Sequence, residues 1–204
     1  MGKSRWGAGM GVAAGLFLVV SSQGASRVEI TPLIGFRDGG HFTEQTVGEK
    51  YEFDGDVAGG LLLAFDLDGT SFLEVSFISQ ATLLVPANSS SILPTFEIDI
   101  DDLQVGGHYM FGEGKVRPFV RGTLGITRLD PTFPDTDDEY QFSFGLGGGV
   151  KTYFNDHLGL RFDARLLGTT LTSSEIFCID DACLDPKGTV IFQGEVTVGL
   201  IVAF

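Results

Sequence analysis

The sequence predicts an all-β protein, an eight-stranded antiparallel up-and-down β-barrel. Apolar and polar residues alternate with a period of two along most of the chain after Arg27, which is the pattern of strands. The chain contains 29 glycines and 18 phenylalanines; glycine is a poor helix former, and phenylalanine favours strands. Short and long connections alternate between the predicted strands, as expected for a meander with two unlike ends.

Eight segments carry the alternation, each with one apolar face and one polar or small face. In one of them, Leu158, Leu160 and Phe162 share a face, and Arg161 and Asp163 lie on the other. The eight segments are residues 27–37, 57–66, 71–81, 101–111, 117–128, 141–154, 158–168 and 192–204.

The connections between these segments fall into two classes. Three are tight turns with the sequences "DLDGT", "GEGK" and "NDH", whose Asp, Asn and Gly residues tolerate the positive φ angles of hairpins. The other four are long and acidic, about residues 37–56, 82–97, 130–140 and 170–188. One end of the barrel should therefore carry short turns and the other end long loops.

The charges indicate which face points inward. A soluble barrel would enclose its apolar face, whereas a membrane barrel turns that face outward. The chain has a net charge of −14, but its polar strand faces carry five acidic and five basic residues. Enclosed ions need partners, so this balance predicts an ion-paired lumen. The predicted lumen network is Glu29, Arg37, Glu74, Asp102, Arg121, Lys151, Arg161, Asp163, Arg165 and Glu195.

The apolar faces support the same orientation. They carry almost no charge over about nine to eleven residues each, the length that crosses a bilayer at a tilt. Aromatic residues are predicted to form an interfacial girdle near the short-turn end. The girdle residues are Phe36, Phe65, Tyr109, Phe111, Phe154 and Phe204. These observations predict a transmembrane barrel.

The first 26 residues are predicted to be a secretory signal peptide. Lys3 and Arg5 precede an apolar run from Val12 to Val20, and small residues follow, with cleavage expected near residues 24–26. The barrel domain then spans residues 27–204. Export predicts a disulfide between Cys178 and Cys183, because exported chains meet an oxidising compartment. Free thiols, or a metal site with neighbouring aspartates, are the alternatives.

The signal peptide, the meander and the terminal "VGLIVAF" together resemble the small eight-stranded outer-membrane barrels of Gram-negative bacteria, of the OmpA, OmpX and OmpW type. The resemblance covers the whole mature chain. It implies an outer-membrane location, a surface in contact with lipid, and recognition of Phe204 by the barrel-assembly machinery. The OmpW likeness also implies a small channel or uptake path for small apolar molecules.

One motif favours an enzyme when it is considered alone. "LLLAFDLDGTS" matches the nucleophile motif of haloacid-dehalogenase-type phosphatases, with Asp66 as nucleophile and Asp68 as acid/base. That fold is α/β, but the two-residue period resumes directly after the motif, which favours a hairpin turn. His41, His108 and His157 are too scattered along the predicted barrel for a joint metal site.

The sequence thus predicts a monomeric, non-enzymatic barrel without a cofactor. Its expected role is structural or surface-interacting, with the long loops available to extracellular ligands. A small channel is the alternative, and an outer-membrane hydrolase is disfavoured because no Ser/His/acid set converges. Nucleic acid is an improbable partner for so acidic a chain.

Overall fold

The computed structural model describes residues 27–43, 50–86, 96–131, 139–171, 177–179, 182–184 and 189–204. The predicted signal peptide, residues 1–26, lies outside the described residues, as do parts of the four long connections. Among the described residues, no helix is long and apolar enough to cross a membrane.

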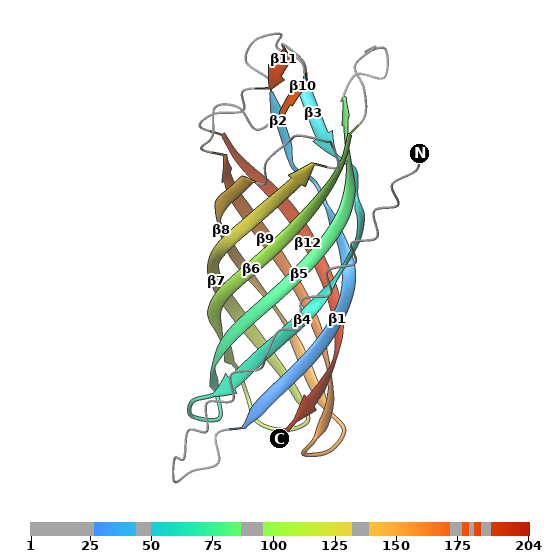
Figure 1. Ribbon diagram of the computed structural model, residues 1–204. Helices are drawn as coiled ribbons and strands as arrows, with labels where there is room; N and C mark the ends of the chain where they lie inside the picture. The colour runs from blue at the N-terminus through green and yellow to red at the C-terminus, as the bar shows by residue number, and fades with distance from the viewer. Residues whose placement is uncertain are drawn as a thin grey trace, which may run out of the picture.

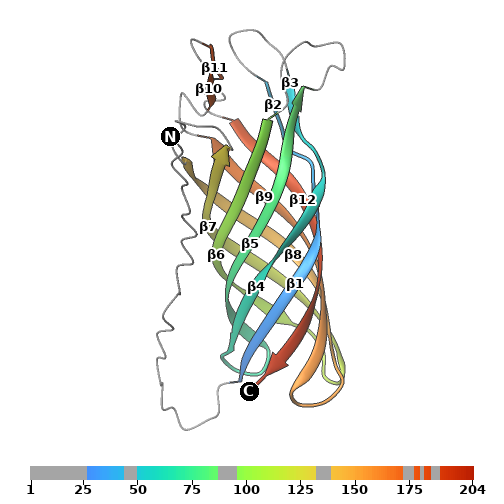
Figure 2. The ribbon, with the colours of Figure 1, turned by 45° about the vertical axis from the view of Figure 1, so that its right-hand side comes forward.

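Eight long antiparallel strands form a closed barrel, as the sequence predicts (Figures 1 and 2). Each strand pairs with the next one around the barrel, and the last strand pairs with the first to close it. The strands are β1 (Val28–Asp38), β4 (Asp56–Asp66), β5 (Ser71–Pro86), β6 (Phe96–Met110), β7 (Val116–Pro131), β8 (Glu139–Tyr153), β9 (Leu158–Leu171) and β12 (Thr189–Ala203).

Four short strands lie within two of the long connections. β2 (His41–Thr43) pairs with β3 (Lys50–Phe53), and β3 pairs with the end of β5. β10 (Phe177–Ile179) and β11 (Ala182–Leu184) form a separate hairpin. Several barrel strands also run further into the predicted loops than the alternation of apolar residues suggested. β5 continues to Pro86, for example, where a loop was expected from residue 82.

The start of β1 and the end of β12 lie side by side at the short-turn end. The backbone N–H groups of Val28 and Phe204 each donate a hydrogen bond to the other's carbonyl, at 3.3 and 2.9 Å. Phe65, which is the register partner of Val28, lies at this end too. The prediction was wrong for Phe36, which lies near the loop end of β1, beside Val57 and Val196. Phe36 is therefore not part of an aromatic girdle at the short-turn end.

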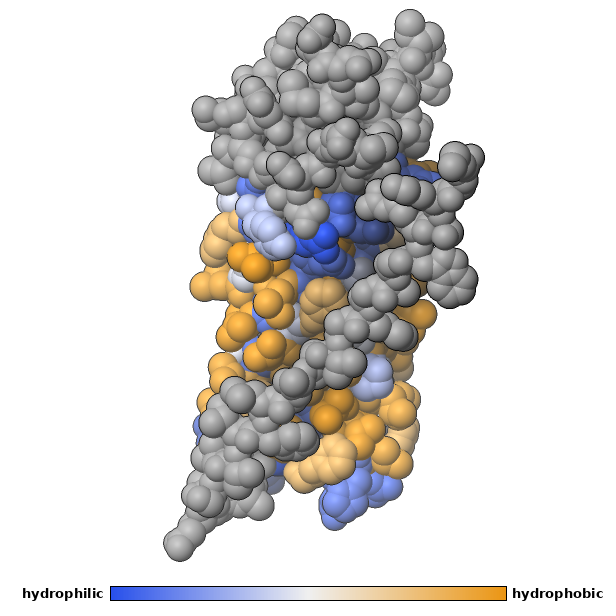
Figure 3. Space-filling model, in the orientation of Figure 1, coloured by the Kyte–Doolittle hydropathy of each residue, from blue (hydrophilic) through white to orange (hydrophobic). Residues whose placement is uncertain are grey.

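The outer face is apolar and the inner face is largely polar. Outward side chains along the strands are exposed phenylalanines, leucines and valines, and Figure 3 shows them as a broad hydrophobic zone on the barrel wall. Interior side chains include most of the buried charged residues of the described chain. This arrangement is the inverse of a soluble barrel, and it fits a wall that faces lipid.

Candidate functional site: an ion-paired lumen

All ten charged residues of the predicted lumen network lie in the barrel interior, and none is more than 6% exposed. Each has at least one oppositely charged partner within 4.0 Å. The ion pairs form three clusters along the barrel axis, from the loop end to the turn end.

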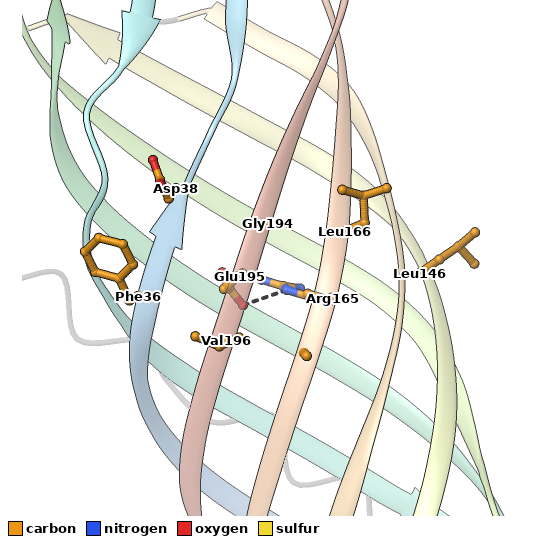
Figure 4. A pocket seen from close by; sticks show the side chains of 9 residues that line it. Phe36, Asp38, Leu146, Arg165, Leu166, Gly194, Glu195 and Val196 are labelled. Atoms are coloured by element: carbon orange, nitrogen blue, oxygen red, sulfur yellow. Dashed lines mark hydrogen bonds and ion pairs between the residues drawn. The ribbon is translucent and has the colours of Figure 1, made fainter.

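The loop-end cluster consists of Arg37, Asp102, Arg165 and Glu195. The guanidinium of Arg37 contacts Asp102 and Glu195, each at 2.6 Å, and so joins opposite sides of the barrel. Arg165 donates to the same Glu195 at 2.7 Å, as drawn in Figure 4. Thr127 adds a hydroxyl hydrogen bond to Asp102. Two guanidinium groups and two carboxylates therefore meet at this level of the lumen.

The central cluster is built around Glu74 and Asp163. Arg161 and Arg121 each contact both carboxylates; Arg161 lies 2.7 Å from Asp163, and Arg121 lies 3.1 Å from it. His108 completes the cluster, with its Nδ1 atom 2.7 Å from Glu74 Oε1. Four strands, β5, β6, β7 and β9, supply these five side chains.

The turn-end cluster surrounds Glu29. Lys151 Nζ and the Tyr153 hydroxyl each donate to this carboxylate at 2.7 Å, and Arg27 lies 3.4 Å away. Two buried aromatic rings pack against the cations of this cluster and of the central one. Lys151 Nζ lies 4.4 Å from the Phe72 ring centre, and Arg161 lies at the same distance from the Phe119 ring, which are cation–π contacts.

Sequence reasoning left two members of the clusters out of the ion-pair network. Tyr153 and His108 lie on predicted polar faces but were not assigned to the network, and the parity that found the charged residues would have found both. The loop-end part of the interior also differs from the prediction of a polar lumen. Buried apolar side chains line this part, because apolar residues occupy the inward positions of the strands there. Outward positions such as Glu97 and Asp99 are exposed and polar. The apolar lining is Ile98, Ile100, Leu129, Leu171 and Ile191.

The barrel wall has a seam at the loop end between β1 and β12. Their pairing ends at Asp38 and Gly194, where Gly39 and Gly40 adopt φ angles of 90° and 98° that favour glycine. The chain then turns away, and β2 pairs with β3 instead. Among the described residues, the five positions of β12 nearest the loops, 189–193, pair only with β9. The side chain of Gln193 bridges the seam by donating to the Gly39 carbonyl at 3.2 Å.

A groove of about 460 Å³ lies on the outer wall next to this seam, where β1 and β12 are still paired (Figure 4). Ala164 and Gly194 are its small residues, and apolar side chains flank it, including Phe36, Leu166 and Val196. The groove lies on the lipid-facing side of the wall, just outside the loop-end cluster.

The phosphatase-like motif is a hairpin turn. Asp66 accepts a hydrogen bond from the Gly69 N–H at 2.6 Å, and Asp68 accepts from the backbone of Thr70 and Ser71 at 2.9 and 2.6 Å. These hydrogen bonds lower the pKa of Asp68 to about 2. Both carboxylates stabilise the β4–β5 turn.

The other candidate residues lie apart. His108 is in the lumen, His157 is in the β8–β9 turn with Nδ1 3.1 Å from the Ala203 carbonyl, and the side chain of His41 is outside the described residues. The described residues contain no group of three or more His, Cys, Asp or Glu arranged to hold a metal. In the β10–β11 hairpin, Cys178 is the register partner of Cys183. Directly opposed residues of an antiparallel pair have Cα atoms about 4.5–5.5 Å apart, which suits the predicted disulfide.

Comparison with known proteins shows similarity in fold only. No protein-family profile and no curated sequence matches the chain. Among solved structures, the outer membrane protein OprG from Pseudomonas aeruginosa is similar, with a TM-score of 0.59, 11% identity, and coverage of 88% of this chain and 96% of that protein. Neisserial surface protein A has a TM-score of 0.52 and 14% identity, over 88% and 97% of the two chains. AlkL, solved in lipid bilayers, has a TM-score of 0.52 and 14% identity, over 90% and 93%.

These similarities confirm the predicted architecture. The apolar outer wall and the enclosed charges are observed in this chain itself, and a bacterial outer-membrane location follows from them together with the fold. The chain therefore has the fold of the small eight-stranded outer-membrane β-barrels that its sequence resembles.

Proposed function

We propose that the protein is an outer-membrane barrel with a closed lumen, which acts as a structural or surface-interaction protein through its loop end. The observation that supports this proposal is the stack of three ion-pair clusters. An eight-stranded barrel leaves interior space only for side chains, and here those side chains bridge the lumen at three levels. A through-going aqueous path would have to break several ion pairs that are shielded from water. The proposal includes no enzymatic activity.

Planar-bilayer recording of the purified barrel tests the closed lumen. At about pH 7.5 the wild type should give no steady current, because every interior charge has a partner. The triple variant Arg37→Ala, Lys151→Ala, Arg161→Ala removes one cation from each of the three clusters. It should conduct, because carboxylates that lose a partner would then be hydrated at every level. Heat-modifiable migration on SDS gels should show that both barrels are folded. A steady current through the wild type would overturn the proposal.

Replacement of residues 87–95 and 132–138 by short Gly/Ser turns tests the surface role. The variant should fold and stay silent in bilayers, because the lumen clusters are untouched. Cells that display the intact chain should attach or aggregate, and cells that display the variant should not. Unchanged attachment would count against a surface role for these connections.

A second candidate function is a sideways path for small apolar molecules, which the seam favours. The apolar lining, the β1–β12 seam and the outer groove all lie in the loop-end half of the barrel. Such a path would bypass the central and turn-end clusters, and Arg165 and Glu195 of the loop-end cluster would line its outer groove. It is therefore compatible with a closed lumen.

Two tryptophan variants distinguish this second function from the first. Gly194→Trp should fill the groove at the seam, where a Cβ would meet only the Asp38 carbonyl oxygen, at 4.0 Å. Gly122→Trp is the matched control on β7, where the nearest atom is Leu146 Cδ2 at 3.6 Å. Uptake of radiolabelled n-octane by whole cells should fall for Gly194→Trp alone. Equal uptake by both variants and the wild type would exclude the path.

A further inference from the structure

Two arginines at the turn-end mouth of the lumen lie outside the charge balance of the ten network residues. Arg27 directly precedes β1 and Arg117 is the second residue of β7, and these two strands lie on opposite sides of the closed barrel. Their guanidinium carbon atoms lie 4.5 and 5.5 Å from the centre of the same ring, that of Tyr153. Tyr153 is buried, whereas both arginines are partly exposed. A ligand that enters the mouth can therefore reach both cations.

The protein supplies few acceptors for these two arginines. Arg27 Nε lies 3.4 Å from Glu29, but Nε and Nη2 are buried without a hydrogen-bond partner among the described residues. Glu29 already accepts hydrogen bonds from two other side chains. Arg117 donates from Nε to the Gly114 carbonyl at 2.9 Å, and no carboxylate of the described chain lies within 4.0 Å of it. Buried donors without acceptors are rare in native proteins, so these groups are free for the oxygens of a ligand.

The charges at this mouth do not balance. Arg27, Arg117 and Lys151 carry three positive charges, and within the described chain Glu29 is the one carboxylate in contact with any of them. None of the described turn carboxylates lies within 4.0 Å of these cations, and those of the β4–β5 turn accept hydrogen bonds from their own backbone. An excess of two positive charges therefore faces the mouth, in a chain whose net charge is −14.

We propose that the turn-end mouth is a binding site for a phosphate group, which Arg27 and Arg117 hold beside the Tyr153 ring. The planar fork of a guanidinium matches the oxygens of a phosphate, and both arginines have donors left for this contact. A phosphate monoester carries a charge of about −1.5 to −2 at pH 7, which would balance the mouth, whereas a carboxylate would supply half of that charge. The short turns of outer-membrane barrels face the periplasm. The ligand would enter from that side, as a soluble phosphate ester or as the phosphate of an inner-leaflet lipid.

Phosphorus NMR titration of the purified barrel with inorganic phosphate, in an uncharged detergent at about pH 7.5, tests the site. The wild type should bind phosphate, and Arg117→Gln should weaken binding at least about tenfold, because one of the two guanidinium groups is lost. Arg117→Lys should also weaken binding, since an ammonium group keeps the charge but lacks the fork. Lys115→Gln is the matched control, because it removes one positive charge from the exposed β6–β7 turn at the same end. It should bind phosphate like the wild type.

Lipid vesicles distinguish the two sources of the phosphate. If a lipid supplies it, inorganic phosphate should not bind to barrels in phosphatidic acid vesicles but should bind in phosphatidylglycerol vesicles, whose phosphate is a diester. If a soluble ester supplies it, inorganic phosphate should bind equally in both.

A wild-type barrel that binds no phosphate in detergent, or an Arg117→Gln barrel that binds it as tightly as the wild type, would overturn the site. Equal losses in Lys115→Gln and Arg117→Gln would also overturn it, because diffuse positive charge would then account for the binding. Heat-modifiable migration should show that each barrel is folded.

Discussion

Single residues in the lumen depend on their partners, because water does not reach them. Arg37 is fully buried and holds two carboxylates from opposite sides of the barrel. Arg128 also contacts two carboxylates, Asp101 and Asp130, but its side chain is 34% exposed on the outer wall. The two arginines make the same kind of contact in different surroundings, so they allow burial to be tested separately from pairing.

Arg37→Met should destabilise the barrel by about 3–5 kcal/mol, because it leaves Asp102 without its cation and Glu195 with one fewer. Arg128→Met should cost about 0–1 kcal/mol, because water replaces the lost contacts. Urea unfolding of barrels refolded in lipid vesicles measures both free energies. Equal losses in the two variants would mean that the lumen is as hydrated as the outer rim.

The charged lumen residues could be predicted from parity, whereas their partners could not. A strand has a period of two, so the strand pattern and the charge balance were enough to assign Arg37 and Glu195 to one interior. Which carboxylate meets which guanidinium depends on strand tilt and stagger, and these are set by the closed barrel. Arg37 reaches Asp102 from five strands away along the chain, and no local pattern signals that contact.

At the scale of one strand, β8 shows how glycine makes room for the plug. Its inward positions 145, 147 and 149 are all glycine. A Cβ on Gly149 would lie 1.9 Å from the Phe162 carbonyl oxygen and 2.9 Å from Phe119 Cζ, a ring that contacts Arg161. The small face noted in the sequence is therefore a requirement for close packing.

Gly149→Ala should lower the folded fraction strongly, because the backbone of β9 would have to shift, and such overpacking costs about 1–3 kcal/mol or more. Gly122→Ala, on the outer face of β7, should be tolerated, because its Cβ would make only an ordinary contact at 3.6 Å. The heat-modifiable band on SDS gels after refolding reports both. A Gly149→Ala barrel as stable as Gly122→Ala would contradict the packing shown here.

The β10–β11 hairpin carries the prediction of a disulfide. If Cys178 and Cys183 are bonded, thiol reagents should label the unfolded protein only after reduction, and the mass should rise by two alkyl groups. Cys178→Ser should expose one reactive thiol. Labelling without a reductant would favour free thiols.

Strand extents were underestimated from the sequence. β5 continues to Pro86, and β6 already begins at Phe96, where the polar residues Glu97 and Asp99 face outward.

At the scale of the whole molecule, the apolar outer wall allows the depth of an outward residue in the membrane to be tested by substitution. The outward face of β7 is apolar from Val116 to Ile126 and ends at Arg128. Val120 lies in the middle of this stretch and Val116 at its turn end, and the two side chains are 52% and 59% exposed. If the wall faced water, the same substitution should change the free energy of unfolding equally at the two positions.

Val120→Lys should therefore cost about 2–4 kcal/mol in lipid vesicles, whereas Val116→Lys should cost about 0–1 kcal/mol, because the cost of a charge on the lipid face falls toward the interface. Urea titration of the vesicle-embedded barrels measures both values. Longer acyl chains should move the boundary of tolerated positions outward along β7, since the apolar stretch of the wall has a fixed length. If both lysines were tolerated equally in every lipid, the apolar wall would not be facing acyl chains, and the ion pairs would have to be explained as the core of a protein in water.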